Sequence, residues 1–178
     1  VAGDRHAFLA GLISTDLPPR PFTPVGAEFV TGSISAPGLA EAARYVTKNS
    51  PLRPIYVYEP ARSSPKPAIN FTLMNGVRAS LALARTNELH AAAAERNPEN
   101  APQLAFADVG GHGYSVVTAR PDRLEVEFVC IPEPLTRSAD ADGGPLTYRV
   151  AHRVRLWKPG QAPQVERTKA EGTLPLVL

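Results

Sequence analysis

The sequence predicts an α+β fold of mostly antiparallel strands with one long helix. Two segments in the second half alternate apolar and polar residues, which is typical of strands with one buried face. Between residues 73 and 96 the chain consists mainly of strong helix formers. With 178 residues, 43% of them hydrophobic, and a single cysteine, the chain can bury a core without disulfides.

A hairpin is predicted over residues 114–119 and 124–131. The intervening Arg120-Pro-Asp-Arg123 places Pro at the second position of a tight turn. On the second strand an apolar face alternates with an acidic one that carries Glu125 and Glu127. Cys130 belongs to the apolar face, so we interpret it as a small core residue.

A third strand is predicted over residues 146–157. Its apolar face consists of Val150, His152, Val154 and Leu156, and its basic face of Arg149, Arg153 and Arg155. We expect the basic face beside Glu125 and Glu127, with Arg153 opposite Glu125, because opposite charges on neighbouring strands attract. His152 is then expected to be a core histidine with satisfied hydrogen bonds.

The first half contains more loop. Residues 1–9 are interpreted as the end of a strand that breaks at Gly3 into a loop exposing Asp4 and His6, and residues 25–38 as a strand entering a second loop. Five prolines within 49–67 predict a surface excursion with one short extended stretch at 55–58. The helix at 73–96 is expected to bury a stripe of Val77, Leu81 and Ala84 and to stop at Asn97-Pro98.

Composition excludes several classes of protein. Nineteen basic against 17 acidic residues give a net charge of +2 without blocks of like charge, so nucleic-acid-specific binding is not expected. The sequence contains no run of 18 apolar residues, so no membrane span is predicted. The first residues lack the layout of a secretory signal, and residue 1 is Val rather than Met, so we expect a fragment or a processed chain, folded as one domain over 1–178.

The strongest candidate for chemistry is Gly3-Asp4-Arg5-His6. A carboxylate and an imidazole two residues apart on one loop can both reach a cation; the alternative is a turn with a capping Asp and an exposed His. His112, among glycines at 110–113, is a second candidate on a flexible loop, with a plain turn residue as its alternative. His90 lies on the polar part of the helix. Asp140 and Asp142 lack the spacing of a calcium-binding EF-hand loop.

Three blocks carry a family resemblance. The first is Gly3-Asp-Arg-His-Ala-Phe-Leu-Ala10 followed by residues 25–38; the second is 74–85 with Asn97-Pro98 and 104–114; the third is 127–132 with 142–153. Together they resemble the last metal motif, the C-terminal helix and the closing hairpin of the PhoD-like alkaline phosphatases, a branch of the calcineurin-type metallophosphoesterases. The blocks occur in the same order and at similar spacing over nearly all of the chain.

The resemblance implies part of an α/β/β/α metallophosphoesterase sandwich. It implies a phosphatase or phosphodiesterase that hydrolyses phosphate esters by metal-activated water, with iron and calcium as the metal ions. By this resemblance Asp4 and His6 would be metal ligands, and Arg5 would be catalytic by contacting phosphate, with an exposed loop arginine as its alternative. His112 would be catalytic if its loop faces the site. A periplasmic or secreted enzyme is expected on the same ground.

The chain also departs from the family pattern. The motifs that supply the family's other metal ligands precede the last motif and do not occur in these residues. We therefore expect no activity from this chain alone, and a missing N-terminal part of the same enzyme as its partner. Gly32 and Gln103 stand where Pro and His are expected. The alternative function is a non-catalytic β-rich accessory or ligand-binding module.

Overall fold

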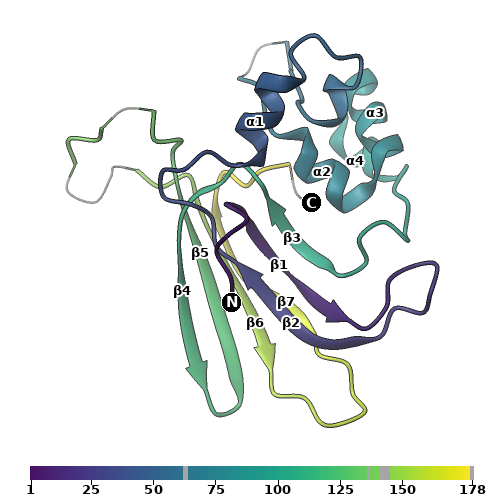
Figure 1. Ribbon diagram of the computed structural model, residues 1–178, viewed down its shortest axis with the longest axis vertical. Helices are drawn as coiled ribbons and strands as arrows, with labels where there is room; N and C mark the ends of the chain where they lie inside the picture. The colour runs from purple at the N-terminus through teal and green to yellow at the C-terminus, as the bar shows by residue number, and fades with distance from the viewer. Residues whose placement is uncertain (62–63, 136, 141–144, 177–178) are drawn as a thin grey trace.

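The computed structural model describes residues 1–61, 64–135, 137–140 and 145–176. Within these residues, seven strands and four α-helices alternate in blocks (Figure 1). In chain order the elements are β1 (Phe8–Ser14), β2 (Pro24–Val30), α1 (Leu39–Val46), the 3₁₀ turn η1 (Arg53–Ile55), α2 (Ala68–Asn75), α3 (Val77–Thr86), α4 (Leu89–Ala93), β3 (Leu104–Asp108), β4 (His112–Arg120), β5 (Arg123–Ile131), β6 (Tyr148–Arg155) and β7 (Val165–Gly172).

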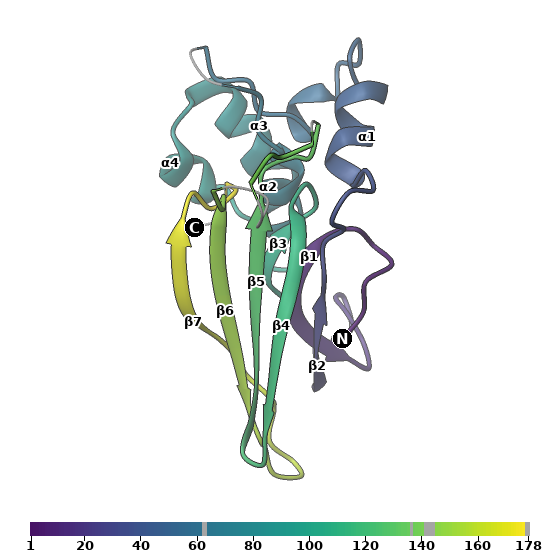
Figure 2. The ribbon, with the colours of Figure 1, turned by 90° about the vertical axis from the view of Figure 1, so that its left-hand side faces the viewer.

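The strands form two sheets. One has the order β2-β1-β3 and the other the order β4-β5-β6-β7, and all neighbouring strands are antiparallel. The four helices gather at one end of the sheets, as two views at right angles show (Figures 1 and 2). The predicted α+β class with mostly antiparallel strands is therefore confirmed.

Aromatic side chains from both sheets meet in one core. Phe8 on β1 stacks on Phe128 of β5 with ring centroids 5.1 Å apart, and Phe106 of β3 lies 5.9 Å from the same ring. All three rings are fully buried. Because the cluster draws on both sheets, the apolar faces of the two sheets cover each other.

The predicted hairpin is confirmed, with Arg120 opposite Arg123 at its turn. The predicted register with the third strand is also confirmed, because Glu125 stands opposite Arg153, whose Nε donates to Glu125 Oε1 at 2.8 Å. The third strand ends earlier than expected: Leu156 lies beyond β6 and is 75% exposed. Cys130 is buried, as expected of a core residue.

The single long helix is wrong, because the segment forms α2, α3 and α4. Gly76 has a φ of +93° between the first two, and Asn87 has a φ of +58° after the third turn of α3. Neither backbone conformation is helical, so each breaks the hydrogen-bond ladder. The buried face of α3 is Ala79, Ser80, Ala82 and Leu83, whereas the expected stripe of Val77, Leu81 and Ala84 is exposed.

Two elements of the first half were not predicted. Residues 8–14 form the central strand β1, and residues 39–46 form α1, for which Glu41 completes a capping box by accepting from the Gly38 N–H at 2.8 Å. The strand expected before Gly3 is a single parallel bridge between Ala2 and Val30. The excursion at 49–67 contains η1 and a bridge between Tyr58 and Lys66. Among the described residues, no helix has the length and apolar character needed to cross a bilayer.

Candidate functional site

The loop carrying Asp4, Arg5 and His6 lies between the Ala2 bridge and β1. The Ala2 N–H donates to Phe29 O at 3.0 Å, and the Thr31 N–H donates to Ala2 O at 2.8 Å, so the backbone just before the loop is fixed to β2. Asp4 and Arg5 are exposed and His6 is half-buried. The loop therefore precedes β1 in the chain. It follows a single bridge at Ala2, and not the end of a strand as expected.

His6 is held in one orientation. Its Nδ1 lies 3.0 Å from the carbonyl oxygen of Pro37. A carbonyl can only accept, so the ring N–H is at Nδ1, and the neutral ring carries its lone pair on Nε2. This is the arrangement found in histidines that bind metals through Nε2. His6 also has a φ of +49°, a left-handed conformation that is costly for a residue other than glycine and is often found at functional sites.

The N-terminus of α1 packs against this loop. A Cβ atom on Gly38 would lie 2.9 Å from the carbonyl oxygens of both His6 and Val109, so only glycine permits this approach. Gly38 thus joins the loop, α1 and the segment after β3 at one point. This contact was not predicted from the sequence, although a Pro-Gly pair before a helix is a turn signal.

His112 is held by Glu41 of α1. It is the first residue of β4, and not part of a flexible loop as expected; its Nε2–H donates to Glu41 Oε1 at 2.9 Å. The His112 side chain is only 5% exposed, and its Nδ1 has no hydrogen-bond partner among the described residues. Burial alone would raise the pKa of Glu41, but the hydrogen bonds from His112 and Gly38 lower it below its usual range. Glu41 is therefore a carboxylate acceptor at neutral pH.

A buried carboxyl group that the sequence analysis missed lies at the same end. Asp108, the last residue of β3, pairs with Phe8 at the start of β1 and is 3% exposed. Its Oδ1 accepts from Asn70 Nδ2 at 3.0 Å and from the Gly110 N–H at 3.1 Å, and its Oδ2 accepts from the Tyr148 hydroxyl at 2.7 Å. Burial raises the pKa of Asp108 despite these bonds. The available signal was an acid that ends an apolar strand and is separated by one residue from the Gly110-Gly111 pair.

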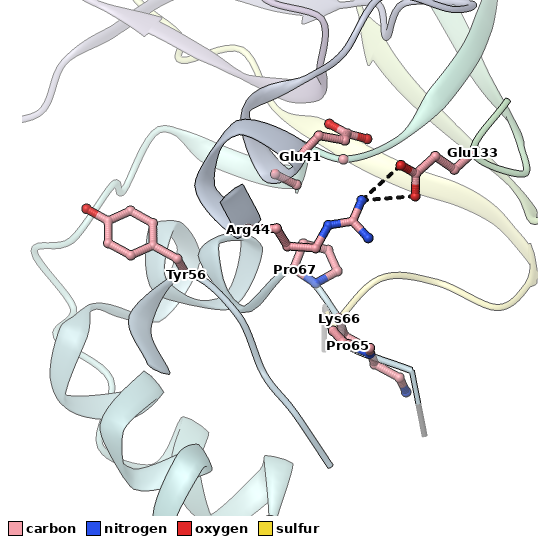
Figure 3. A pocket seen from close by; sticks show the side chains of 9 residues that line it. Glu41, Arg44, Tyr56, Pro65, Lys66, Pro67 and Glu133 are labelled. Carbon is pink, nitrogen blue, oxygen red and sulfur yellow. Dashed lines mark hydrogen bonds and ion pairs between the residues drawn. The ribbon is translucent and has the colours of Figure 1, made fainter. Parts of the chain in front are cut away.

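Two adjoining pockets open beside these groups. The Arg44 pocket, about 120 Å³, is closed on one side by a bidentate pair in which Arg44 Nη2 donates to both carboxylate oxygens of Glu133 at 2.9 and 3.0 Å (Figure 3). The Asp108 pocket, about 210 Å³, includes Asp108, Cys130 and Tyr148 in its wall. The two pockets share Lys66, Pro67, Gly110 and Glu133.

Cys130, in the wall of the Asp108 pocket, has an unreactive thiol. Burial, with Asp108 nearby, raises the pKa of its thiol to about 12, so it is a thiol and not a thiolate nucleophile at neutral pH. Burial likewise raises the pKa of Tyr148, whose hydroxyl stays protonated and donates to Asp108. The pair Asp108 and Tyr148 therefore joins β3 to β6 and links the two sheets at this end.

The remaining candidates lie apart from the loop. His152 is fully buried, as expected, but neither of its ring nitrogens has a hydrogen-bond partner among the described residues. The expectation that its hydrogen bonds are satisfied is therefore wrong. His90 is exposed on α4 and Asp140 is exposed, while Asp142 lies outside the described residues. Over the described part of the chain, no three His, Cys, Asp or Glu side chains are placed to hold one metal ion.

The loop of Asp4 and His6, the pair Glu41 and His112, and the Asp108 cluster thus lie around the same end of the two sheets. Comparison of the chain with protein-family models, with curated proteins and with solved structures finds no match. What can be said about function therefore depends on the residues themselves.

Proposed function

We propose that this chain is the C-terminal part of a PhoD-like metal-dependent phosphatase or phosphodiesterase, and that Asp4 and His6 are two of its metal ligands. The observation that carries the proposal is the hydrogen bond from His6 Nδ1–H to the Pro37 carbonyl at 3.0 Å. It fixes the tautomer in which Nε2 can bind a metal ion. The left-handed backbone of His6 adds support, because such strain persists where the surrounding structure requires it.

The donor set fits part of a metal site. An exposed carboxylate and an imidazole nitrogen with a free lone pair suit iron, and the carboxylate also suits calcium. Two donors do not complete a site, and the family resemblance assigns the remaining ligands to motifs outside these residues. Once bound, the metal ions would polarise the phosphate ester and lower the pKa of the attacking water.

Within this proposal Arg5 and His112 have different tasks. Arg5 is exposed next to both ligands and can reach a phosphate group held at the loop. His112 is tied to Glu41 and buried, so we assign it a positioning role: it holds α1, and through Gly38 the His6 loop, against β4. The two facing antiparallel sheets would be the central layers of an α/β/β/α arrangement, although α1–α4 gather at one end of the sheets and not on their outer faces.

Metal binding by the loop can be tested on the chain itself. We expect Zn²⁺, as a probe without redox chemistry, to shift the ¹⁵N resonance of His6 Nε2 and to bind at least about tenfold more weakly to Asp4→Ala and His6→Ala. Exposed residues elsewhere supply matched controls, His90→Ala and Asp140→Ala, which should leave the affinity unchanged. Equal binding by wild type and both loop variants would contradict the site and favour the non-catalytic module.

Activity gives a separate test. The isolated chain should not hydrolyse an aryl phosphate diester, because two ligands cannot assemble the metal cluster. Turnover by the purified chain that a chelator abolishes would contradict this. In a complete enzyme, full metal occupancy and full activity in both Asp4→Ala and His6→Ala would exclude the loop from the site.

A further inference from the structure

The second sheet ends in a tip that lies opposite the helices. We define the tip as the turn 120–123 and the segment 155–161; both lie at the lower end of Figure 1, far from α1–α4. The Leu156 N–H donates to Asp122 O at 2.8 Å, so the two segments are fixed to each other. The tip is therefore one surface built from two loops.

Apolar side chains project from this surface. Leu156 is 75% exposed and Trp157 is 37% exposed. Two hollows, about 260 and 490 Å³, flank them and have Arg155, Leu156 and Trp157 in common. These three residues thus lie between the two hollows, and we call them the ridge. Neighbouring exposed apolar residues with charged residues around them are typical of an interaction site.

The charges around the ridge are mainly positive. Arg120, Arg155 and Lys158 are exposed, and none of them forms an ion pair with a described carboxylate. Arg123 is already paired, with Asp122 at 3.0 Å and with Glu125 at 3.1 Å. Glu166, in the wall of the larger hollow, is the acidic residue on that side. Asp122, which lies near Arg155 as well as Arg123, is the one carboxylate among the tip residues, against four cations. This excess of positive charge around exposed Leu and Trp is complementary to a lipid bilayer whose headgroups are anionic and whose interior is apolar.

We propose that the tip binds an anionic lipid surface, with Leu156 and Trp157 in the interfacial region and Arg120, Arg155 and Lys158 against the lipid phosphates. Trp is favoured at such interfaces because its ring is apolar and its N–H can bond to water or headgroups. Basic residues near the surface add electrostatic attraction. This inference goes beyond the proposed phosphoesterase activity, since the His6 loop lies near α1 at the other end of the sheets and would face away from the bilayer.

The chain carries its own reporter for this contact, because Trp157 is its only tryptophan. With phosphatidylcholine vesicles containing phosphatidylglycerol, the Trp157 emission should shift to the blue and the chain should sediment with the vesicles. With pure phosphatidylcholine vesicles both signals should be much smaller, and salt should weaken binding to the anionic ones. Equal binding to both vesicle types, or to neither, would overturn the proposal.

Variants locate the surface. Leu156→Ser should weaken vesicle binding about tenfold, and Arg155→Glu about fivefold or more. The matched controls lie at the helical end: exposed Leu52→Ser after α1 and exposed Arg85→Glu on α3 should bind like wild type. Thermal unfolding of each variant separates loss of binding from loss of fold. Equal losses in the controls, or a blue shift that follows protein concentration without vesicles, would overturn the proposal in favour of non-specific attraction or self-association.

Discussion

His152 shows what one residue does inside the core. Its ring centroid lies 5.5 Å from that of Phe106 and 5.6 Å from that of Phe128, and neither ring nitrogen has a hydrogen-bond partner within the described part of the chain. Burial, helped by the positive charge of Arg167, lowers the pKa of His152 from 6.5 to about 4. The neutral ring is therefore the form that the folded chain contains at pH 7.

The free energy of unfolding should consequently depend on pH through His152. The unfolded chain binds this proton at pH values where the folded chain does not, so stability falls as the pH drops from about 6.5 toward 4, by up to about 3 kcal/mol. His152→Leu should remove this dependence and, because it removes unpaired polar atoms, raise the free energy of unfolding at pH 7 by about 1 kcal/mol.

Urea unfolding at pH 7 and pH 5 measures both effects. Exposed His90→Leu on α4 is the control and should keep the wild-type difference between the two pH values. A His152→Leu variant with an unchanged difference would show that His152 is not the titrating group. The burial of His152 followed from strand alternation, but its missing partners could not be predicted, because they depend on which residues the opposite sheet places around the ring.

At the scale of the strand pair, the Glu125–Arg153 contact lends itself to a double-mutant cycle. Both side chains are partly exposed, and the Nε–Oε1 distance is 2.8 Å. We expect a coupling energy of a few tenths to about 1 kcal/mol from Glu125→Gln, Arg153→Gln and the double variant, by chemical denaturation. A coupling energy indistinguishable from zero would mean that the ion pair contributes nothing to the strand pair. Exchanging the two charges is not neutral, because Arg123 Nε also donates to Glu125 Oε1 at 3.1 Å and would then face a like charge.

The segment 73–96, predicted as one helix, shows that helix breaks are harder to predict than helices. Its composition indicated helix correctly, but propensity cannot place a break that tertiary contacts impose. Gly76 adopts its non-helical φ beside two hydrogen bonds from a distant segment. The Asn97 N–H donates to Asn75 O at 3.0 Å, and Asn100 Nδ2 donates to Leu73 O at 2.6 Å. Those bonds join residues more than twenty positions apart, so no local window contains them.

The whole molecule depends on the aromatic contact between its sheets. Phe128→Ala removes a ring that stacks on Phe8 and contacts Phe106, so we expect a loss of about 3 to 5 kcal/mol in the free energy of unfolding. Because both sheets lose the same partner, Trp157 fluorescence and far-ultraviolet circular dichroism should report one common transition at lower denaturant. Two separated transitions would instead mean that the sheets unfold independently.

At this scale the sequence predicted the hairpin, its third strand and their pairing, because each signal lies within one alternating segment. It missed the central strand β1, since Phe8–Ser14 is a mostly apolar run without alternation, in which the buried residues are Phe8, Ala10 and Gly11. For the proposed site, the spacing of Asp4 and His6 made them candidates, and their role stays a prediction. The Pro37 carbonyl that orients His6 and the partners of Asp108 were not identifiable, because they come from loops and helices placed only by the complete fold.

In the order β4-β5-β6-β7, the two edge strands of the second sheet, β4 and β7, differ in their exposed side chains. β7 carries Glu166, Arg167, Lys169 and Glu171, and charges of both signs discourage another chain from adding a strand there. β4 exposes Tyr114, Val116 and Val117, each by almost half. Aggregation at high protein concentration should therefore start along β4. Val117→Lys is the substitution best suited to keep the chain monomeric, because it places a charge on this edge strand.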